Sequence, residues 1–246
     1  MGANYHCLLL DVDGTLLDFQ KAEQEAILGT LQRFELPTDA GTIAQYSQIN
    51  AALWEKLDKG EIKKDQLVVR RFEQLLAALG TQGDAVLMNS DFLTRLSMAA
   101  PVIHGAVELL AELAEFATLA AVSNAVYKVQ MQRLEKSGLL PYFDDVFVSE
   151  KLGVTKPSPK FFDLALKKLG IKNKQKVLVV GDNLVADIKG GAAAGLDTCW
   201  CNFTGAENTT GIAPTHTVRS YPELKLVAVG EEALAYYETR EKRHMV

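Results

Sequence analysis

The stretch Cys7-Leu8-Leu9-Leu10-Asp11-Val12-Asp13-Gly14-Thr15 decides the fold of this chain. The apolar run up to Leu10 predicts a buried strand, and the residues after it are typical of a turn. Because side chains alternate along a strand, Asp11 and Asp13 can leave it on the same side. Two neighbouring carboxylates repel each other, and a divalent cation relieves that repulsion. The stretch therefore indicates either two aspartates that act beside Mg2+ or a simple strand-end turn, and the remaining sequence must decide.

Length and composition are those of a protein with a sizeable core. The chain has 246 residues, enough for one large domain or one domain with an insertion, and 48% of them are hydrophobic. Its net charge of −5 argues against a protein that coats a nucleic-acid polymer, which would need a basic face. A small anionic substrate stays compatible with this charge, because a bound metal ion can invert the local electrostatics.

Cysteine usage and hydropathy bear on the compartment. The chain contains three cysteines, an odd and sparse number that favours a reducing environment. No apolar stretch approaches the ~20 residues of a membrane span, and the N-terminus lacks the segment order of a secretory signal. We therefore expect a soluble cytoplasmic protein without a membrane partner. A monomer and a dimer are both compatible with the sequence.

Strand-like and helical segments alternate along most of the sequence. This alternation predicts an α/β fold with a doubly wound parallel sheet, whose ligands bind outside the carboxyl ends of the strands. The expected strands are 6–10, 119–123, 145–149, 176–181, 197–202 and 216–220; a short helix is expected at 186–194, a closing helix at 222–237 and a solvated charged tail at 240–244.

One region departs from this alternation. Between residues 18 and 97 apolar residues recur at helical spacing and no strand pattern intervenes. The break at Leu36-Pro37 and the glycines at 60, 80 and 83 divide the region into about four helices. The predicted organisation is an α/β catalytic core of residues 1–17 and 98–246, with an all-helical cap of residues 18–97 that could act as a lid.

Polar residues follow the expected strands at their carboxyl ends. Because these ends share one edge of a parallel sheet, the side chains should converge there. A carboxylate can attack phosphorus, a second can move the proton, Mg2+ takes oxygen ligands, and a lysine with a hydroxyl can hold phosphoryl oxygens. These residues are Asp11 and Asp13 after the first strand, Ser123 and Asn124 after the second, Lys156 after the third, and Asp182, Asn183 and Asp187 after the fourth.

The chain resembles the haloacid dehalogenase superfamily of phosphotransferases. Its four motifs are an Asp-x-Asp-Gly-Thr, a Ser or Thr that ends the second strand, a Lys before Pro, and a Gly-Asp with a further Asp. All four occur in the family's order and span nearly the whole chain, and the helical insert resembles the family's first class of cap. The matching residues are Asp11 to Thr15, Ser123, Lys156-Pro157, and Gly181-Asp182 with Asp187.

The resemblance implies a role for each matching residue. Asp11 is expected to be the nucleophile and a metal ligand, and Asp13 the general acid/base whose backbone carbonyl also binds the metal. Ser123 and the Asn124 backbone are expected to bind phosphate, and Lys156 to neutralise the phosphoryl charge and orient Asp11. Asp182 is expected to be a ligand of Mg2+. Asn183 and Asp187 are expected to contact the metal ligands rather than the metal itself.

Alternatives within the same family differ at few residues. Dehalogenases lack the acid/base that stands at the second Asp of the first motif. The presence of Asp13 there favours a phosphatase. Phosphonate hydrolysis would need a lysine in the insert, where the lysines have the pattern of a solvated face. A phosphosugar or phosphoglycolate-type phosphatase, or a phosphosugar mutase, would share all four motifs. A catalytically silent binding protein is the alternative from another class, although none of the charged residues is missing.

Substrate choice depends on the helical insert. The chain resembles the branch that cleaves pyrimidine nucleoside 5′-monophosphates, so a nucleotide is the expected partner. The resemblance lies in the order of Tyr46, Asn50, Trp54, Gly60 and Arg70-Arg71-Phe72, and in Thr198-Cys199-Trp200 and Gly211-Ile212-Ala213-Pro214-Thr215. Asn50 could bind a base edge and Trp54 could stack on a base, or both could belong to the interior of the helical insert. Arg70 and Arg71 are expected at the surface, and His104 in a hinge or loop.

Overall fold

The computed structural model describes residues 3–235 and residue 239, which form two compact units. The α/β unit contains the described residues within 1–17, 102–127 and 137–246, and the helical unit contains residues 18–101 and 128–136. The division expected from the sequence placed the second boundary between residues 97 and 98. Residues 236–237 of the predicted closing helix and the charged tail at 240–244 lie outside the described residues.

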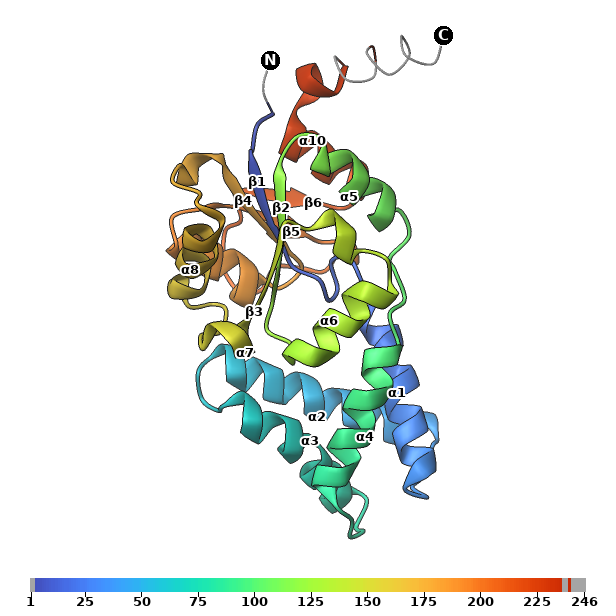
Figure 1. The fold of residues 1–246 in the computed structure, drawn as a ribbon. Helices are drawn as coiled ribbons and strands as arrows, with labels where there is room; N and C mark the ends of the chain where they lie inside the picture. The colour runs from blue at the N-terminus through green and yellow to red at the C-terminus, as the bar shows by residue number, and fades with distance from the viewer. Residues whose placement is uncertain (1–2, 236–238, 240–246) are drawn as a thin grey trace. The chain divides into compact units, whose positions relative to one another are not determined.

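The α/β unit is built on a six-stranded parallel sheet in the order β3-β2-β1-β4-β5-β6, which confirms the predicted fold class (Figure 1). The strands are β1 (Cys7–Leu10), β2 (Thr118–Ser123), β3 (Asp145–Val148), β4 (Val177–Gly181), β5 (Asp197–Cys201) and β6 (His216–Val218).

Strand β1 lies at the centre of the sheet because it is apolar on both faces. Leu8, Leu9 and Leu10 are fully buried, as expected for a strand covered on both sides. Leu10 lies opposite Ala121 of β2 and opposite Val180 of β4. The residues that follow these three strands therefore leave the same edge of the sheet side by side.

Helices connect the strands and cover the sheet. Phe161 and Phe162 of α8 are fully buried in a core cluster with residues of β1, β2, β3 and β4. The helices are α5 (Ala106–Ala114), α7 (Ser149–Leu152), α8 (Pro159–Leu169), α9 (Gly190–Ala193) and α10 (Tyr221–Val229), with the short η1 (Leu140–Tyr142), η2 (Lys174–Lys176) and η3 (Leu184–Lys189).

Two of the expected helices differ from the observed ones. The helix expected at 186–194 is a π-helix, η3, followed by α9, because Ile188 N donates to the carbonyl of Asn183 five residues earlier. The closing helix α10 ends at Val229, where Gly230 adopts a φ of 89°.

The helical unit contains α1 (Phe19–Arg33), α2 (Ala40–Asp58), α3 (Lys64–Ala78) and α4 (Ala85–Met98), together with α6 (Tyr127–Lys136). Asp18, Asp39 and Asp84 cap the first, second and fourth of these helices, since each carboxylate accepts a backbone N–H of the first turn. The buried rings of Tyr46 and Phe92 lie 5.6 Å apart in its interior.

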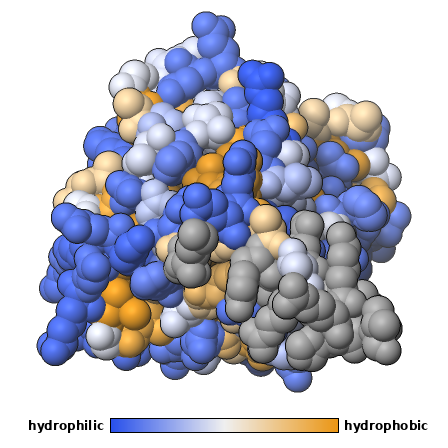
Figure 2. All heavy atoms as spheres, turned by 90° about the horizontal axis from the view of Figure 1, so that it is seen from above, coloured by the Kyte–Doolittle hydropathy of each residue, from blue (hydrophilic) through white to orange (hydrophobic). Residues whose placement is uncertain are grey.

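Polar side chains dominate the face of the molecule that Figure 2 shows. The apolar side chains on this face form small separate patches. Among the described residues, no helix combines the length and the apolar character that crossing a membrane requires.

Candidate active site

Three carboxylates lie together at the carboxyl edge of the sheet, where the sequence analysis expected all three. Asp11 follows β1, Asp182 follows β4, and Asp187 lies in η3. One carboxylate oxygen from each lies within 4.8 Å of the others, which is close enough for a single metal ion to bind all three. Asp187, which the sequence placed behind the metal ligands, is therefore a member of the acidic cluster itself.

Lys156 is buried between two of these carboxylates. Its Nζ lies 2.6 Å from Asp11 Oδ1 and 2.6 Å from Asp187 Oδ1, and it also donates to the carbonyl of Val122 at 2.9 Å. These three acceptors match the three donors of an ammonium group, so a lysine that is only 2% exposed keeps all its hydrogen bonds. This arrangement fixes the orientation of the Asp11 carboxylate.

Asn124 ties the end of β2 to the segment that carries Lys156. Its Oδ1 accepts from the Lys156 backbone N at 3.0 Å, and its Nδ2 donates to the Lys156 carbonyl at 2.9 Å. The neighbouring Ser123 is buried, and its Oγ accepts from the Ala125 backbone N at 3.1 Å. The Asn124 side chain thus positions Lys156, a function that the sequence analysis did not assign to it.

Asp13 lies two residues beyond Asp11 in a tight turn. The N–H groups of Leu16 and Leu17 both donate to the Val12 carbonyl, which closes this turn. Gly14 adopts a φ of 83°, and a side chain there would collide with the carboxylate of Asp182. Glycine at this position therefore lets the turn of Asp13 and the acidic cluster approach each other closely.

Asn183 begins the π-helix that carries Asp187. Its Oδ1 accepts from the backbone N–H groups of Val185 and Ala186, as a helix cap does. The Asn183 backbone N also donates to Asp187 Oδ2 at 3.2 Å. Both oxygens of Asp187 are thus occupied by donors from the protein, one from Lys156 and one from this backbone.

The electrostatics of the cluster fit a divalent cation. Burial raises the pKa of Asp11 well above its usual value, Lys156 lowers it, and Asp187 and Asp182 raise it again. Asp182 is exposed as a whole residue, but the protein around its carboxyl removes water from it. This loss of solvation raises the pKa of Asp182 to about 7, and the charge of Asp187 contributes to the rise. Burial alone would lower the pKa of Lys156, but Asp11 and Asp187 raise it above its usual value.

When ionised, the three carboxylates outnumber the one ammonium group among them. Carboxylate oxygens are the ligands that hard divalent ions prefer, and a bound dication would relieve the repulsion within the cluster. The residues present therefore fit a metal ion of this kind.

Asn50 of the helical unit lies in a buried chain of polar side chains, with one member from each of α1 to α4. Asn50 Nδ2 donates to Glu23 Oε1 at 2.5 Å, and Asn50 Oδ1 accepts from Arg71 Nη1 at 3.3 Å. Arg71 Nη2 in turn donates to Asn89 Oδ1 at 2.8 Å. Both ends of the Asn50 amide are thus engaged, which supports its interpretation as a satisfied interior residue.

Arg71 corrects an expectation from the sequence. It was expected at the surface with Arg70, yet Arg71 is 2% exposed, whereas Arg70 is exposed. The Arg71 guanidinium also lies 4.4 Å from the ring centroid of Phe92, so aromatic contact accompanies its hydrogen bonds. Trp54 is half-buried against Leu53, Leu57 and Leu67, and its Nε1 has no hydrogen-bond partner among the described residues.

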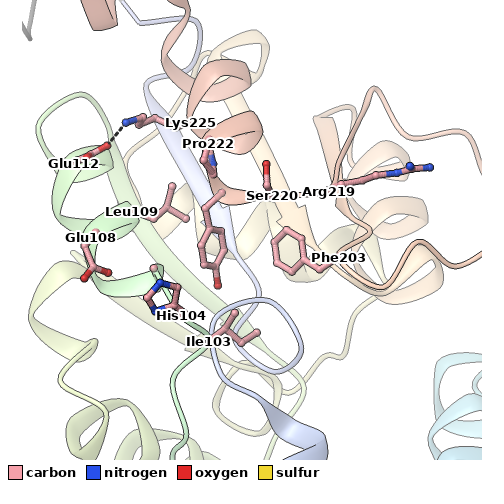
Figure 3. Close-up of a pocket in the computed structure, with 12 residues that line it drawn as sticks. Ile103, His104, Glu108, Leu109, Glu112, Phe203, Arg219, Ser220, Pro222 and Lys225 are labelled. Carbon is pink, nitrogen blue, oxygen red and sulfur yellow. Dashed lines mark ion pairs between the residues drawn. The ribbon is translucent and has the colours of Figure 1, made fainter.

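A separate pocket of about 490 Å³ opens between α5 and the start of α10 (Figure 3). Ile103, Leu109 and Phe203 form apolar walls, and Glu112 pairs with Lys225 at 2.6 Å on its rim. His104 lines this pocket from the turn before α5, consistent with the loop position expected for it. No residue of the acidic cluster lines the pocket.

A buried lysine between aspartates at the carboxyl edge of a parallel sheet, with a helical insert after β1, defines an α/β protein with an acidic, metal-compatible centre. The model of haloacid dehalogenase-like hydrolases matches residues 5–195. The chain therefore belongs to the haloacid dehalogenase-like hydrolase family.

Several relatives match this chain over most of their own length. The chain is 38% identical to the HAD-hydrolase YfnB of Bacillus subtilis, with 89% of this chain and 94% of the relative covered. It is 37% identical to the pyrimidine 5′-nucleotidase PynA of Streptococcus pneumoniae (89% and 93%) and 36% identical to the pyrimidine 5′-nucleotidase YjjG of Escherichia coli (89% and 95%).

A crystal structure of the YfnB protein, described as bound to magnesium, superposes with a TM-score of 0.86 and 38% identity, and the match covers 90% of this chain and 97% of that one.

Proposed function

We propose that this protein is a magnesium-dependent phosphatase that hydrolyses small phosphomonoesters through an aspartyl-phosphate, with pyrimidine nucleoside 5′-monophosphates preferred. The observation that carries the proposal is the placement of Asp11, held by Lys156 at 2.6 Å, in one cluster with Asp182 and Asp187. The names of PynA and YjjG, pyrimidine 5′-nucleotidases at 37% and 36% identity, support the nucleotide as substrate.

The proposed reaction has two displacements. A carboxylate oxygen of Asp11 attacks phosphorus, the bond to the ester oxygen breaks, and Asp13 protonates the departing alcohol. Asp13 then takes a proton from water, whose oxygen attacks the same phosphorus and releases inorganic phosphate while Asp11 is regenerated. Ser123, the Asn124 backbone and Lys156 hold the phosphoryl oxygens as charge develops on them.

Asp11, Asp182 and the backbone carbonyl of Asp13 are the proposed ligands of Mg2+, with Asp187 beside them. Bound there, Mg2+ would shield the negative phosphoryl group from the negative carboxylates. Asn183 supports this site indirectly, because it caps the helix that presents Asp187.

A substrate panel tests the proposal directly. Phosphate release is measured with and without Mg2+ from UMP, CMP, dTMP, AMP, GMP, ribose 5-phosphate, glucose 6-phosphate and phosphoglycolate. We expect metal-dependent activity and the highest kcat/KM for the pyrimidine nucleotides. A preference for sugar phosphates or phosphoglycolate would overturn the nucleotide assignment, and no release from any substrate would favour a silent binding protein.

Asp13→Asn is expected to slow turnover by about 10²- to 10⁴-fold, the usual contribution of a general acid/base. The change removes the proton-transferring group and keeps the shape of the side chain. Inhibition by inorganic phosphate should stay near the wild-type value, because Asp13 is not a proposed phosphate ligand. A kcat within twofold of wild type would contradict the role of Asp13.

Trp54→Ala tests the proposed contact with the base. If the Trp54 ring stacks on the base, the ratio of kcat/KM for UMP to that for ribose 5-phosphate should fall by about tenfold, within the range measured for base–aromatic stacking. Ribose 5-phosphate is the internal control because it lacks a base, and Trp54→Phe should retain most of the preference. An unchanged ratio would assign Trp54 to the interior packing of the helical unit alone.

Asn50 is the other proposed substrate residue of the helical unit. Its amide already bonds Glu23 and Arg71, so contact with a base would require it to exchange one of these partners. The same UMP to ribose 5-phosphate ratio, measured for Asn50→Ala, separates such a contact from a purely structural role.

A further inference from the structure

Two aromatic side chains outside the acidic cluster donate hydrogen bonds to the backbone of the loops that build it. Trp200 Nε1 donates to the Asp182 carbonyl at 2.9 Å, and the Tyr221 hydroxyl donates to the Thr15 carbonyl at 2.7 Å. Neither side chain has a role in the reaction proposed above. Each links a different segment to one of the two loops: Asp182 and Trp200 are 18 residues apart, and Thr15 and Tyr221 are 206 residues apart.

Trp200 holds the loop that follows β4. It lies in β5 directly opposite Gly181 and is 8% exposed. The carbonyl that it binds belongs to Asp182, whose carboxylate is part of the acidic cluster. Since a carbonyl beyond the last paired residue of a strand has no partner in the sheet, the indole N–H supplies the bond that fixes it.

Tyr221 holds the turn that follows β1. Its ring meets Phe203 edge to face, with centroids 5.2 Å apart at 83°, and a side chain at Gly105 would press against the other atoms of this ring. Burial raises the pKa of Tyr221, so its hydroxyl stays protonated and remains a donor at physiological pH. The ring also lines the pocket of Figure 3, so its contacts with Phe203 and near Gly105 hold it on one side and its hydroxyl holds the turn.

The two supported loops touch each other at Gly14. The space where a Gly14 side chain would lie contains the carboxylate of Asp182. A shift of the Thr15 turn or of the Asp182 backbone would therefore change how Asp182 lies relative to Asp11 and Asp13. The two hydrogen bonds act on the spacing of these three aspartates from outside the cluster.

We propose that Trp200 and Tyr221 are positioning residues that set metal affinity and turnover through the backbone of the two acidic loops. This proposal rests on the proposed magnesium-dependent phosphatase function. Trp200 would act on the ligand Asp182 and so on metal affinity. Tyr221 would act on the turn that holds Asp13 and so on the rate of the chemical steps.

The test uses Trp200→Phe and Tyr221→Phe, which keep an aromatic ring and remove only the donor. Tyr5→Phe is the matched control, because it also removes an aromatic hydrogen-bonding group. The Tyr5 hydroxyl contacts Asp197 at 2.8 Å and His216 at 3.0 Å. These partners are the first residues of β5 and β6, at the opposite ends of the strands from the acidic cluster. Metal binding is measured by titration calorimetry of the full chain with Mg2+ alone. Turnover is measured at saturating Mg2+, and the melting temperature is recorded for every variant.

We expect Trp200→Phe to weaken Mg2+ binding by about tenfold, as the loss of a partner that orients a metal ligand does. Tyr221→Phe should lower kcat at saturating Mg2+ by about fivefold, the effect of one lost hydrogen bond, with KM nearly unchanged. Tyr5→Phe should lower the melting temperature while it leaves Mg2+ affinity and kcat at wild-type values.

Wild-type Mg2+ affinity in Trp200→Phe together with wild-type kcat in Tyr221→Phe would overturn the proposal. Equal losses of affinity and kcat in Tyr5→Phe would also overturn it, because general destabilisation would then explain the effects. If the wild-type chain binds Mg2+ but releases no phosphate, the phosphatase proposal fails, and the calorimetric comparison of Trp200→Phe still decides the role of Trp200.

Discussion

Asp11→Asn is expected to lower kcat for every substrate by at least about 10³-fold, because removal of a nucleophile leaves only the contributions of binding and electrostatics. The amide is too weak a nucleophile to attack phosphorus, yet it occupies the same volume at the end of β1. The change also removes one of the two carboxylates that hold Lys156, since Asp11 Oδ1 lies 2.6 Å from its Nζ. The Asp187 contact at 2.6 Å and the Val122 carbonyl at 2.9 Å remain, so the lysine should stay in place.

One further measurement and one control variant accompany the rates of Asp11→Asn. Rapid quenching during turnover of a radiolabelled substrate should trap a phosphorylated protein in wild type and none in the variant. Asp163→Asn is the matched control, because Asp163 is half exposed and its partner Lys174 lies on the surface. That control should keep wild-type kcat. Turnover by Asp11→Asn within tenfold of wild type would rule out Asp11 as the attacking group.

The fold could be predicted because its signals are local. The central strands are short apolar runs buried on both faces, and a run such as Leu8 to Leu10 stands out in the sequence. The helices of the helical unit could be predicted equally well, because their apolar residues recur at helical spacing. Asp18, Asp39 and Asp84 cap three of these helices. Residue types that suit phosphoryl chemistry then mark the strand ends, so the main members of the acidic cluster could be named.

Contacts that depend on distant partners could not be predicted in the same way. Arg71 has the appearance of a surface residue because a charged side chain is rarely buried. It is buried here because Asn50 of α2 and Asn89 of α4 accept its hydrogen bonds, and no periodicity within α3 reveals those partners. The hydrogen bond of Trp200 could not be predicted for a further reason: its acceptor is the Asp182 carbonyl, and every residue carries a carbonyl.

The local geometry of η3, which carries Asp187, could not be predicted from the sequence either. The small residues at 186–194 predicted an ordinary helix, whereas η3 is a π-helix that begins at the Asn183 cap. Within it, Asp187 is fully buried, and its carboxylate accepts from Lys156 and from the Asn183 backbone. Sequence spacing placed this side chain at the edge of the sheet but could not show that it joins the acidic cluster, because its direction depends on the wider turn of the π-helix.

Lys156→Met is expected to affect both stability and activity more than any other change to a single cation in the described structure. Methionine fills a similar volume but leaves the buried carboxylates of Asp11 and Asp187 without their shared partner. Breaking a buried ion pair by removing one side typically costs about 3–5 kcal/mol of unfolding free energy. Turnover should also fall by about 10²-fold or more, the effect of losing one group that stabilises charge in the transition state.

The loss of stability in Lys156→Met should depend on pH and on metal. Lys156 lowers the pKa of Asp11, so its removal raises that pKa further, and the carboxyl becomes neutral at a higher pH. A neutral carboxyl needs no cation, so the deficit against wild type should be larger at pH 8 than at pH 5. Mg2+ should recover part of the deficit, because a ligand that binds only the folded state stabilises it by mass action.

Urea unfolding with and without Mg2+, at both pH values, measures these differences. Lys174→Met is the matched control: Lys174 also bonds one carboxylate, Asp163, and one carbonyl, that of Ala194, but its side chain is 44% exposed. Exposed pairs of this kind contribute little to stability, so this control should unfold close to wild type. A Lys156→Met protein as stable as wild type at pH 8 without metal would show that the acidic cluster does not depend on Lys156 for its charge balance.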